Sequence, residues 1–137
     1  MADIVDKATR SRMMSGIRGK NTLPELQVRS LLHRAGFRFQ LHRRDLPGKP
    51  DLVLPKYHMI IFVNGCFWHQ HAGCMLASVP KTNKKFWRVK LSGNVARDKR
   101  VRARLRNAGW HVFTIWECEI NEHGLHKLLS KIKRVVQ

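Results

Sequence analysis

The segment Gly65–Cys74 constrains the fold of this chain more than any other part of its sequence. It reads Gly-Cys-Phe-Trp-His-Gln-His-Ala-Gly-Cys, so two cysteines and two histidines lie close together. Cys118, the third and last cysteine, lies far downstream at the end of an expected strand. Zinc in structural sites takes four tetrahedral ligands from thiolate and imidazole, and Cys66, one histidine, Cys74 and Cys118 would make such a set. The sequence therefore predicts a zinc-bound loop that is tied to a distant strand.

Spacing alone does not decide which histidine would be the fourth zinc ligand. In extended backbone His69 and His71 point the same way, whereas Gln70 between them points opposite. We prefer His71 because it lies closer to Cys74 in the sequence. The alternative use of the cysteines is core packing, since free cysteines are often small buried apolar side chains. Four protein ligands leave no open position on zinc, so any chemistry would lie elsewhere in the chain.

The chain carries a large excess of basic residues. It has 27 Lys and Arg against 9 Asp and Glu, which gives a formal net charge of +18. Such a surface repels itself, so an anionic partner is the expected working context. Nucleic acid is the leading partner, because each phosphate contact releases a condensed counterion. The alternatives are a solvated basic surface without a partner and a membrane surface, but no lipidation signal or basic amphipathic anchor stands out.

The sequence also indicates where the protein works. Its amino terminus has no basic segment followed by an apolar one, so export is not expected. The longest apolar run, Met59–Val63, is too short to span a bilayer. We therefore expect no membrane association, a cytoplasmic location and, for the DNA-bound protein, association with the bacterial nucleoid.

The chain length of 137 residues suits one domain. Residues 1–21 form an expected basic, DNA-contacting arm, because their basic side chains follow no steady period. Residues 22–137 form the expected folded domain. Thr22-Leu23-Pro24-Glu25 is typical of a helix-capping box, and Gly36 would end the helix that begins there.

After residue 36 the hydrophobic pattern changes between strands and helices. Alternation predicts a strand over residues 37–41, and the run at 59–63 suits a central strand that is covered on both sides. Residues 64–81 show no clear period and indicate a long loop. Further elements are expected as strands at 51–54 and 110–116, and as helices at about 83–107, with a candidate break at Ser92-Gly93, and about 125–136. Helices that flank a small mixed sheet define the α/β class.

A candidate catalytic site surrounds Asp51. This residue begins the apolar strand Leu52-Val53-Leu54, and a carboxylate at the edge of such a strand can offer oxygen ligands to Mg²⁺. Glu25 is a second acid that could approach the metal, and His69 would be the general base. Each of the three also has an ordinary reading: Asp51 as a turn residue, Glu25 as the capping-box acid, and His69 as a spare zinc ligand or phosphate contact.

Several segments together resemble the very short patch repair (Vsr) endonuclease family, and the resemblance covers nearly the whole chain. They are Asp6-Lys7-Ala8-Thr9-Arg10-Ser11, Leu46-Pro47-Gly48-Lys49-Pro50-Asp51, Phe62-Val63-Asn64-Gly65-Cys66-Phe67-Trp68-His69, Phe86-Trp87, Asn94, Arg97-Asp98 and Trp116-Glu117-Cys118-Glu119. The resemblance implies a restriction-endonuclease-like fold, a mixed β-sheet flanked by helices in a single domain with a structural zinc loop.

The resemblance implies a Mg²⁺-dependent endonuclease that nicks duplex DNA 5′ to the thymine of a T·G mismatch. Such mismatches arise when 5-methylcytosine deaminates, and the nick would initiate very short patch repair. The expected partners are double-stranded DNA with that mismatch and, functionally, a DNA cytosine methyltransferase and general mismatch-repair factors. We expect a monomer.

The resemblance also implies roles for individual residues. Asp51 would bind Mg²⁺ through its carboxylate and Val63 through its backbone carbonyl, while His69 would be the base with Glu25 in support. The zinc ligands would be Cys66, His71, Cys74 and Cys118. The DNA contacts would come from Phe67, Trp68 and Trp87 as a wedge beside the mismatch, and from Met14, Arg10, Arg12, Lys49 and Arg97.

The chain departs from the family pattern at position 64. The family carries a second active-site histidine there, and this chain has Asn64, which can hydrogen-bond but cannot be protonated. A separate expectation concerns the helix at 83–107: Phe86 aligns with Val89, which predicts Phe86 in the core and Trp87 outward.

Two other functions remain open at this point. One is a broader mismatch or sequence-specific nuclease that cuts as a restriction enzyme does. The other is a non-catalytic zinc-containing DNA-binding module, in which Asn64 would mark the decay of the site.

Overall fold

The computed structural model describes residues 22–136. The expected arm at 1–21, with Arg10, Arg12 and Met14, lies outside the described residues. The main elements are α2 (Leu23–Arg34), β1 (Gln40–Leu41), β2 (Leu52–Leu54), β3 (Met59–Asn64), α3 (Lys84–Asn107), β4 (His111–Trp116) and α4 (Glu122–Val136). Short 3₁₀ turns lie at Pro55–Tyr57, Met75–Ala77 and Glu117–Glu119.

The four strands form one mixed sheet in the order β1-β2-β3-β4. The β1–β2 and β2–β3 pairs are antiparallel, and β3 pairs with β4 in parallel, with Ile60 opposite Val112. A parallel pair needs a long crossover connection, which is supplied by the loop after β3 together with α3. This arrangement confirms the predicted α/β class and the central position of the strand that begins at Met59.

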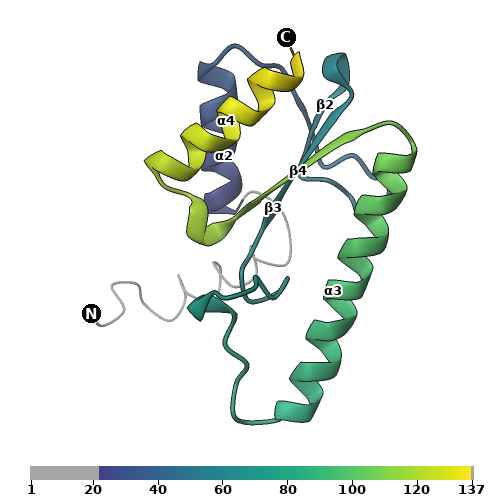
Figure 1. Ribbon diagram of the computed structural model, residues 1–137, viewed down its shortest axis with the longest axis vertical. Helices are drawn as coiled ribbons and strands as arrows, with labels where there is room; N and C mark the ends of the chain where they lie inside the picture. Colours follow the sequence, from purple (N-terminus) through teal and green to yellow (C-terminus); the bar gives the residue numbers. More distant parts are fainter. Residues whose placement is uncertain (1–21, 137) are drawn as a thin grey trace.

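Helices cover both faces of the sheet (Figure 1). Helices α2 and α4 pack on one face, where Leu32 and Ile132 join the larger core cluster. Helix α3 covers the other face, where Leu105 packs with Val53 and Ile60. All three residues of β2 are buried, as are the first three of β3, because neither face of these strands is open to water.

The first expected strand is shorter than predicted. Only Gln40 and Leu41 pair with β2, opposite Val53 and Leu52. Phe37 is buried instead in the core and meets the edge of the Tyr57 ring at 5.9 Å between centroids. The alternation at 37–41 therefore reflects core packing as well as strand structure.

Helix α3 is continuous, so the candidate break at Ser92-Gly93 is wrong. An added Cβ at Gly93 would have no neighbour within 4 Å, which places this glycine on an open helix surface. One glycine costs a helix about 1 kcal/mol, which a helix of 24 residues tolerates. Within residues 22–136, no helix has both the length and the apolar character needed to cross a membrane.

Candidate functional site

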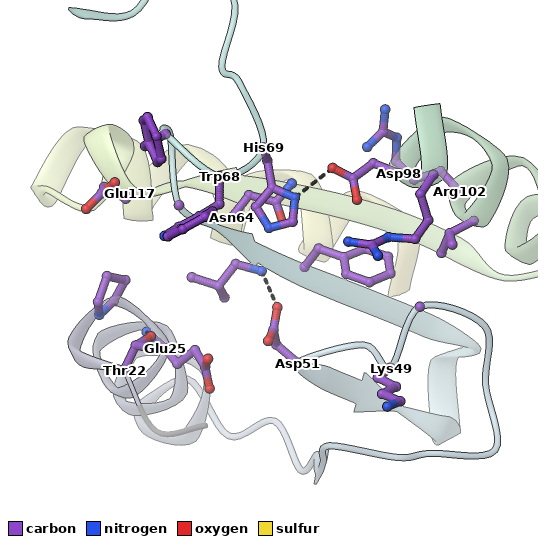
Figure 2. A pocket seen from close by; sticks show the side chains of 18 of the residues that line it. Thr22, Glu25, Lys49, Asp51, Asn64, Trp68, His69, Asp98, Arg102 and Glu117 are labelled. Atoms are coloured by element: carbon purple, nitrogen blue, oxygen red, sulfur yellow. Dashed lines mark hydrogen bonds and ion pairs between the residues drawn. The ribbon is translucent and has the colours of Figure 1, made fainter. Parts of the chain in front are cut away.

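An open cleft of about 990 Å³ lies where the amino-terminal end of α2, the ends of β2 and β3, and one face of α3 meet. Figure 2 shows Asp51 and His69 facing this cleft from two sides, with Asn64 between the strand end and the loop. Helix α3 contributes Asp98 and Arg102. The strand ends and the two helices thus bring together residues that are far apart in the sequence.

Asp51 is the most perturbed carboxyl in this cleft. Its Oδ2 accepts a hydrogen bond of 2.7 Å from the backbone N–H of Val63. Burial raises the pKa of Asp51 from 3.8 to about 7, and the neighbouring Glu25 carboxylate adds to the rise, while the Val63 bond opposes it. A buried carboxyl that ionises near neutrality is a group whose charge a bound cation would stabilise.

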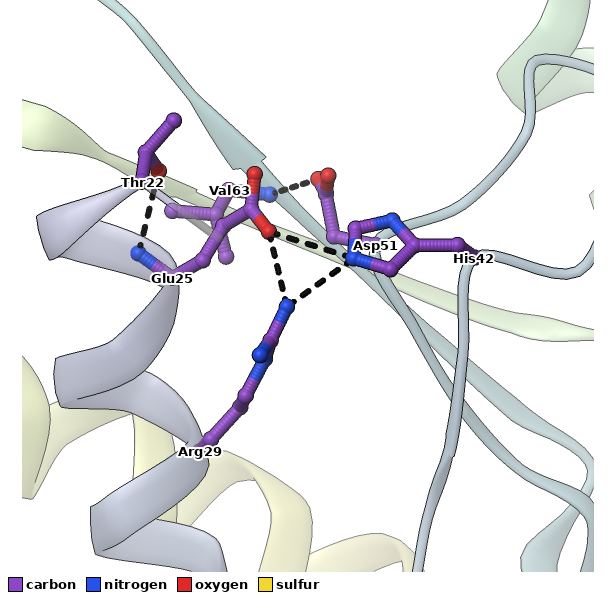
Figure 3. Close-up of polar contacts among 6 residues, drawn as sticks. All are labelled: Thr22, Glu25, Arg29, His42, Asp51 and Val63. Carbon is purple, nitrogen blue, oxygen red and sulfur yellow. Dashed lines mark hydrogen bonds and ion pairs between the residues drawn. The ribbon is translucent and has the colours of Figure 1, made fainter. Parts of the chain in front are cut away.

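Glu25 lies beside Asp51 at the start of α2 (Figure 3). Thr22 caps the helix as predicted, because its Oγ1 accepts the N–H of Glu25 at 3.4 Å. The Glu25 carboxylate is buried and turns to other partners: Nη2 of Arg29 donates to it at 3.1 Å, and Nε2 of His42 lies 3.6 Å away. Its role is therefore larger than that of a capping-box acid.

The sequence analysis did not identify His42. Its Nε2 lies 2.9 Å from Nη2 of Arg29, and the ligand atoms of Glu25, His42 and Asp51 all lie within 4.8 Å of one another. The backbone N–H of His42 donates to the carbonyl of Asp51 at 3.4 Å, which continues the β1–β2 pairing. Only this pairing brings His42 to the site, so no local sequence pattern marks it.

His69 is held by a carboxylate on α3. Its Nδ1 lies 2.6 Å from Oδ2 of Asp98 (Figure 2), and both side chains are largely buried. A carboxylate at one ring nitrogen orients the imidazole and stabilises its protonated form. Sequence reasoning missed this role of Asp98, although the signal was present, because Asp98 is the one acid in the basic sequence of α3.

The predicted zinc ligands Cys66, His71, Cys74 and Cys118 form a single cluster. Their ligand atoms lie within 4.8 Å of one another, and Nδ1 of His71 lies 3.7 Å from Sγ of Cys66 and 3.3 Å from Sγ of Cys118. Ligands at about 2.0–2.3 Å from a tetrahedral zinc are separated by roughly 3.3–3.8 Å, so the cluster fits that ion. Burial raises the pKa of the Cys66 thiol to about 12, and a cation would offset that cost of ionisation.

The loop conformation separates the two candidate histidines. The backbone N–H of His69 donates to the carbonyl of Gly65 at 3.1 Å, and that of His71 donates to the carbonyl of Cys66 at 3.0 Å. The segment is therefore a tight turn and is not extended. His71 lies in the cysteine cluster and stacks on Trp116 at 4.2 Å, whereas His69 faces Asp98. The backbone N–H of Cys66 also donates to Glu117 at 3.0 Å, which fixes the loop to the end of β4.

The aromatic residues of this loop pack against α3. Phe67, Trp68 and Trp87 form a cluster with ring centroids 5.1–5.9 Å apart, and all three line the cleft. The assignment of Phe86 to the core is wrong: its side chain is 58% exposed and that of Val89 is 69% exposed. This part of α3 runs past the sheet, so the loop is the neighbour that covers Trp87, and the outward face has no sheet to pack on.

The other predicted site residues lie around the same cleft. Asn64 is buried at the end of β3, and Lys49 and Arg97 are exposed at the cleft wall. The side-chain amide of Asn94 donates to the carbonyl of Trp68 at 3.0 Å, which ties the loop to α3. A carboxylate site for a cation and a histidine–aspartate pair, beside a helix dense in Lys and Arg, define the class of metal-dependent nucleases.

The comparisons with known proteins agree with this class. The family model described as DNA mismatch endonuclease Vsr matches residues 2–75. A protein named DNA mismatch endonuclease Vsr from Escherichia coli is 45% identical over 131 residues, which cover 96% of this chain and 82% of that protein. A protein named Type II nicking enzyme V.XorIIP from Xanthomonas oryzae pv. oryzae is 47% identical over 124 residues, 90% of each chain. The chain belongs to the Vsr family of DNA mismatch endonucleases.

Proposed function

We propose that this chain has a restriction-endonuclease-like fold and nicks duplex DNA on the 5′ side of the thymine in a T·G mismatch, as the first step of very short patch repair. The observation that carries the proposal is that the partly buried Asp51 carboxyl and the His69–Asp98 pair face one cleft. Membership of the Vsr family supports it independently.

Asp51 and Val63 would hold the magnesium ion. One oxygen of Asp51 accepts the N–H of Val63, and in a strand the N–H and carbonyl of one residue turn to the same side. The carbonyl of Val63 is therefore turned toward Asp51, as a joint site requires. Bound Mg²⁺ would supply positive charge that neutralises the developing negative charge on the phosphate.

His69 would take the proton from the attacking water. Asp98 fixes Nδ1, so Nε2 is the ring nitrogen that remains for the proton, and the charge that develops on the ring is stabilised by Asp98. Glu25 supports the site by its negative charge next to Asp51. Asn64 can contact the phosphate by a hydrogen bond but cannot give a proton to the departing oxygen.

The aromatic cluster Phe67, Trp68 and Trp87 would insert beside the mismatch. Wedges of this kind unstack a base step, and a mismatched step costs least to open. Lys49 and Arg97 at the cleft wall would contact phosphates, together with Arg10 and Arg12 of the arm. Met14 of the arm would approach the opposite groove. The zinc ligands Cys66, His71, Cys74 and Cys118 would hold the loop that presents the first two aromatic rings.

The substrate links the protein to two other activities. A T·G pair forms where a cytosine methyltransferase has made 5-methylcytosine, so a functional link to such an enzyme follows from the substrate. General mismatch-repair factors would be the other functional partners. We propose that the chain acts on DNA as a monomer.

A second candidate is a nicking enzyme with broader mismatch or sequence specificity. It is favoured by the names of several relatives, among them Type II nicking enzyme V.NmeAIP from Neisseria meningitidis, 38% identical over 99% of this chain and 100% of that protein. Asn64 is a feature of this chain that could alter the choice of substrate. A non-catalytic DNA-binding module is the third reading.

A panel of end-labelled duplexes distinguishes these functions. We expect a nick on the T strand of T·G in Mg²⁺, mapped to the 5′ side of the thymine, and none on the matched duplex. Randomised bases around the mismatch would reveal the sequence context. Equal cutting of several mismatches would support the broader nuclease, and binding without any nick would support the module.

A further inference from the structure

The cluster Glu25, Arg29 and His42 contains a nitrogen donor that the function proposed above does not use. Nε2 of His42 lies 3.6 Å from Oε2 of Glu25, and its ligand atom is within 4.8 Å of that of Asp51 (Figure 3). Two ligands of one octahedral ion lie roughly 3–4.2 Å apart, for metal–ligand distances near 2.1 Å. The Glu25–His42 separation falls in this range, and the three side chains together could hold one cation.

The guanidinium of Arg29 places a positive charge between Glu25 and His42. Its Nη2 lies 3.1 Å from Glu25 and 2.9 Å from Nε2 of His42. A guanidinium can only donate hydrogen bonds, so Arg29 and His42 form a hydrogen bond here only where Nε2 of His42 accepts, with its lone pair directed at the cluster. A metal ion requires this same form of the imidazole.

The backbone holds His42 in place. It has a left-handed conformation with φ of 51°, which is uncommon for a residue other than glycine, and its N–H is bonded to the carbonyl of Asp51. The side chain is 17% exposed, and that of Glu25 is 5% exposed. An imidazole that is fixed and mostly buried next to two carboxylates is prepared for a ligand.

We propose that Glu25 and His42 complete the ligand set of the divalent cation that Asp51 and the Val63 carbonyl hold, and that His42 makes this site prefer Mn²⁺ to Mg²⁺. The inference rests on the proposed function only for the presence of a cation at Asp51. Mg²⁺ takes oxygen ligands almost alone, whereas transition metals gain from an imidazole nitrogen. Arg29 moves away from His42 when the ion binds.

Electron paramagnetic resonance of bound Mn²⁺ tests this ligand directly. The full-length protein, with its zinc cluster loaded, is titrated with Mn²⁺ and examined for modulation by a coordinated ¹⁴N. We expect the modulation in the wild type, and its replacement by a ¹⁵N signal in protein labelled with ¹⁵N-histidine. A wild-type spectrum without nitrogen modulation overturns the proposal, whatever any variant does.

The variant His42→Gln identifies the histidine. We expect it to lose the nitrogen signal and about tenfold or more of its Mn²⁺ affinity, while Mg²⁺ affinity from competition changes by less than about threefold. His126→Gln, at an exposed position on α4, is the matched control and should change neither. A signal that persists in His42→Gln and disappears in His69→Gln would assign the nitrogen to His69 and contradict the proposal.

Nicking assays separate this inference from the proposed function. We expect His42→Gln to lose any advantage of Mn²⁺ over Mg²⁺ in the nicking of T·G duplex, whereas His126→Gln keeps the metal preference of the wild type. If no preparation nicks in either metal, the proposed function fails, and the nitrogen signal still decides whether His42 is a ligand.

Discussion

Asp51 couples the stability of the metal-free protein to pH. Burial raises its pKa from the ordinary aspartate value of 3.8 to about 7 in the folded chain. The folded state therefore holds a proton that the unfolded state has released between these two values. It follows that folding stability falls as pH rises from about 4 to about 7 and is level above that.

Replacing Asp51 by a neutral group should remove this loss of folding stability at higher pH. We predict that Asp51→Asn, in buffer without added divalent cations, is more stable than the wild type at pH 8 by about 1–3 kcal/mol. At pH 3 the difference should nearly vanish, because Asp51 is then largely protonated in both states. Thermal and denaturant unfolding at the two pH values measures it, and a variant that is less stable at pH 8 contradicts the assigned burial cost.

Asp98 is a positioning residue for His69. We predict that Asp98→Asn lowers the single-turnover nicking rate by about 10²–10⁴-fold, because the ring loses its orientation and the charge that stabilises its protonated form. DNA affinity should change little, since Asp98 is held by His69. Asp45→Asn, at an exposed pair with Arg43 outside the cleft, is the matched control. A nicking rate within threefold of the wild type would exclude this role.

The residues of the site could be predicted from the sequence only where a motif marks them. Asp51, His69 and Glu25 were all found, and they line one cleft. His42 reaches the site through strand pairing, which a local sequence window does not contain. Asp98 depends on how α3 lies against the loop, and that packing is a property of the folded chain.

At the scale of elements, α3 offers a simple test of helix energetics. Gly93 lies within a continuous helix, and an added Cβ would meet nothing within 4 Å. We predict that Gly93→Ala stabilises the protein by about 0.5–1 kcal/mol, because alanine restricts the unfolded chain and favours helix. Gly124→Ala is the contrasting variant, since its Cβ would clash with the carbonyl of Glu119, and it should destabilise. Denaturant unfolding of both variants checks the pair.

The proposed zinc site in the loop after β3 provides the second test at this scale. We predict about one zinc per chain, and that Cys74→Ala loses the metal, lowers Tm and weakens nicking, because the turn that carries Phe67 to His69 is no longer fixed. Met75→Ala, at a neighbouring side chain that is 90% exposed, should retain both zinc and Tm. Metal analysis that finds less than about half an equivalent in the wild type would contradict the assignment.

The secondary structure was predictable where one pattern dominates. The central strand and α4 follow from their apolar runs. The strand at 37–41 was predicted too long because Phe37 packs in the core instead of pairing with β2, and Phe86 was misplaced because α3 continues beyond the sheet. Both errors concern what an element packs against, which its own sequence does not specify.

At the scale of the whole molecule, the net charge of +18 favours binding to DNA, and basic residues such as Arg97 and Arg102 line the cleft. Helix α3 carries much of the charge, in Lys84, Lys85, Arg88, Lys90, Arg97, Lys99, Arg100, Arg102, Arg104 and Arg106. These residues surround the helix, so only those near the cleft, such as Arg97 and Arg102, can contact the cut strand. Phosphate contacts make affinity strongly dependent on salt, so binding and cleavage have to be measured at one ionic strength.

The central claim is that cleavage of the DNA strand requires the cation site at Asp51, whereas DNA binding depends on the rest of the molecule. Its most direct test is the single-turnover nicking rate of T·G duplex in Mg²⁺, with DNA affinity measured on the same samples of wild type and Asp51→Asn. We predict a rate at least about 1000-fold lower in the variant, with affinity within about threefold, because the carboxylate is lost while the binding surface remains. A variant that still nicks within tenfold of the wild type would contradict this account.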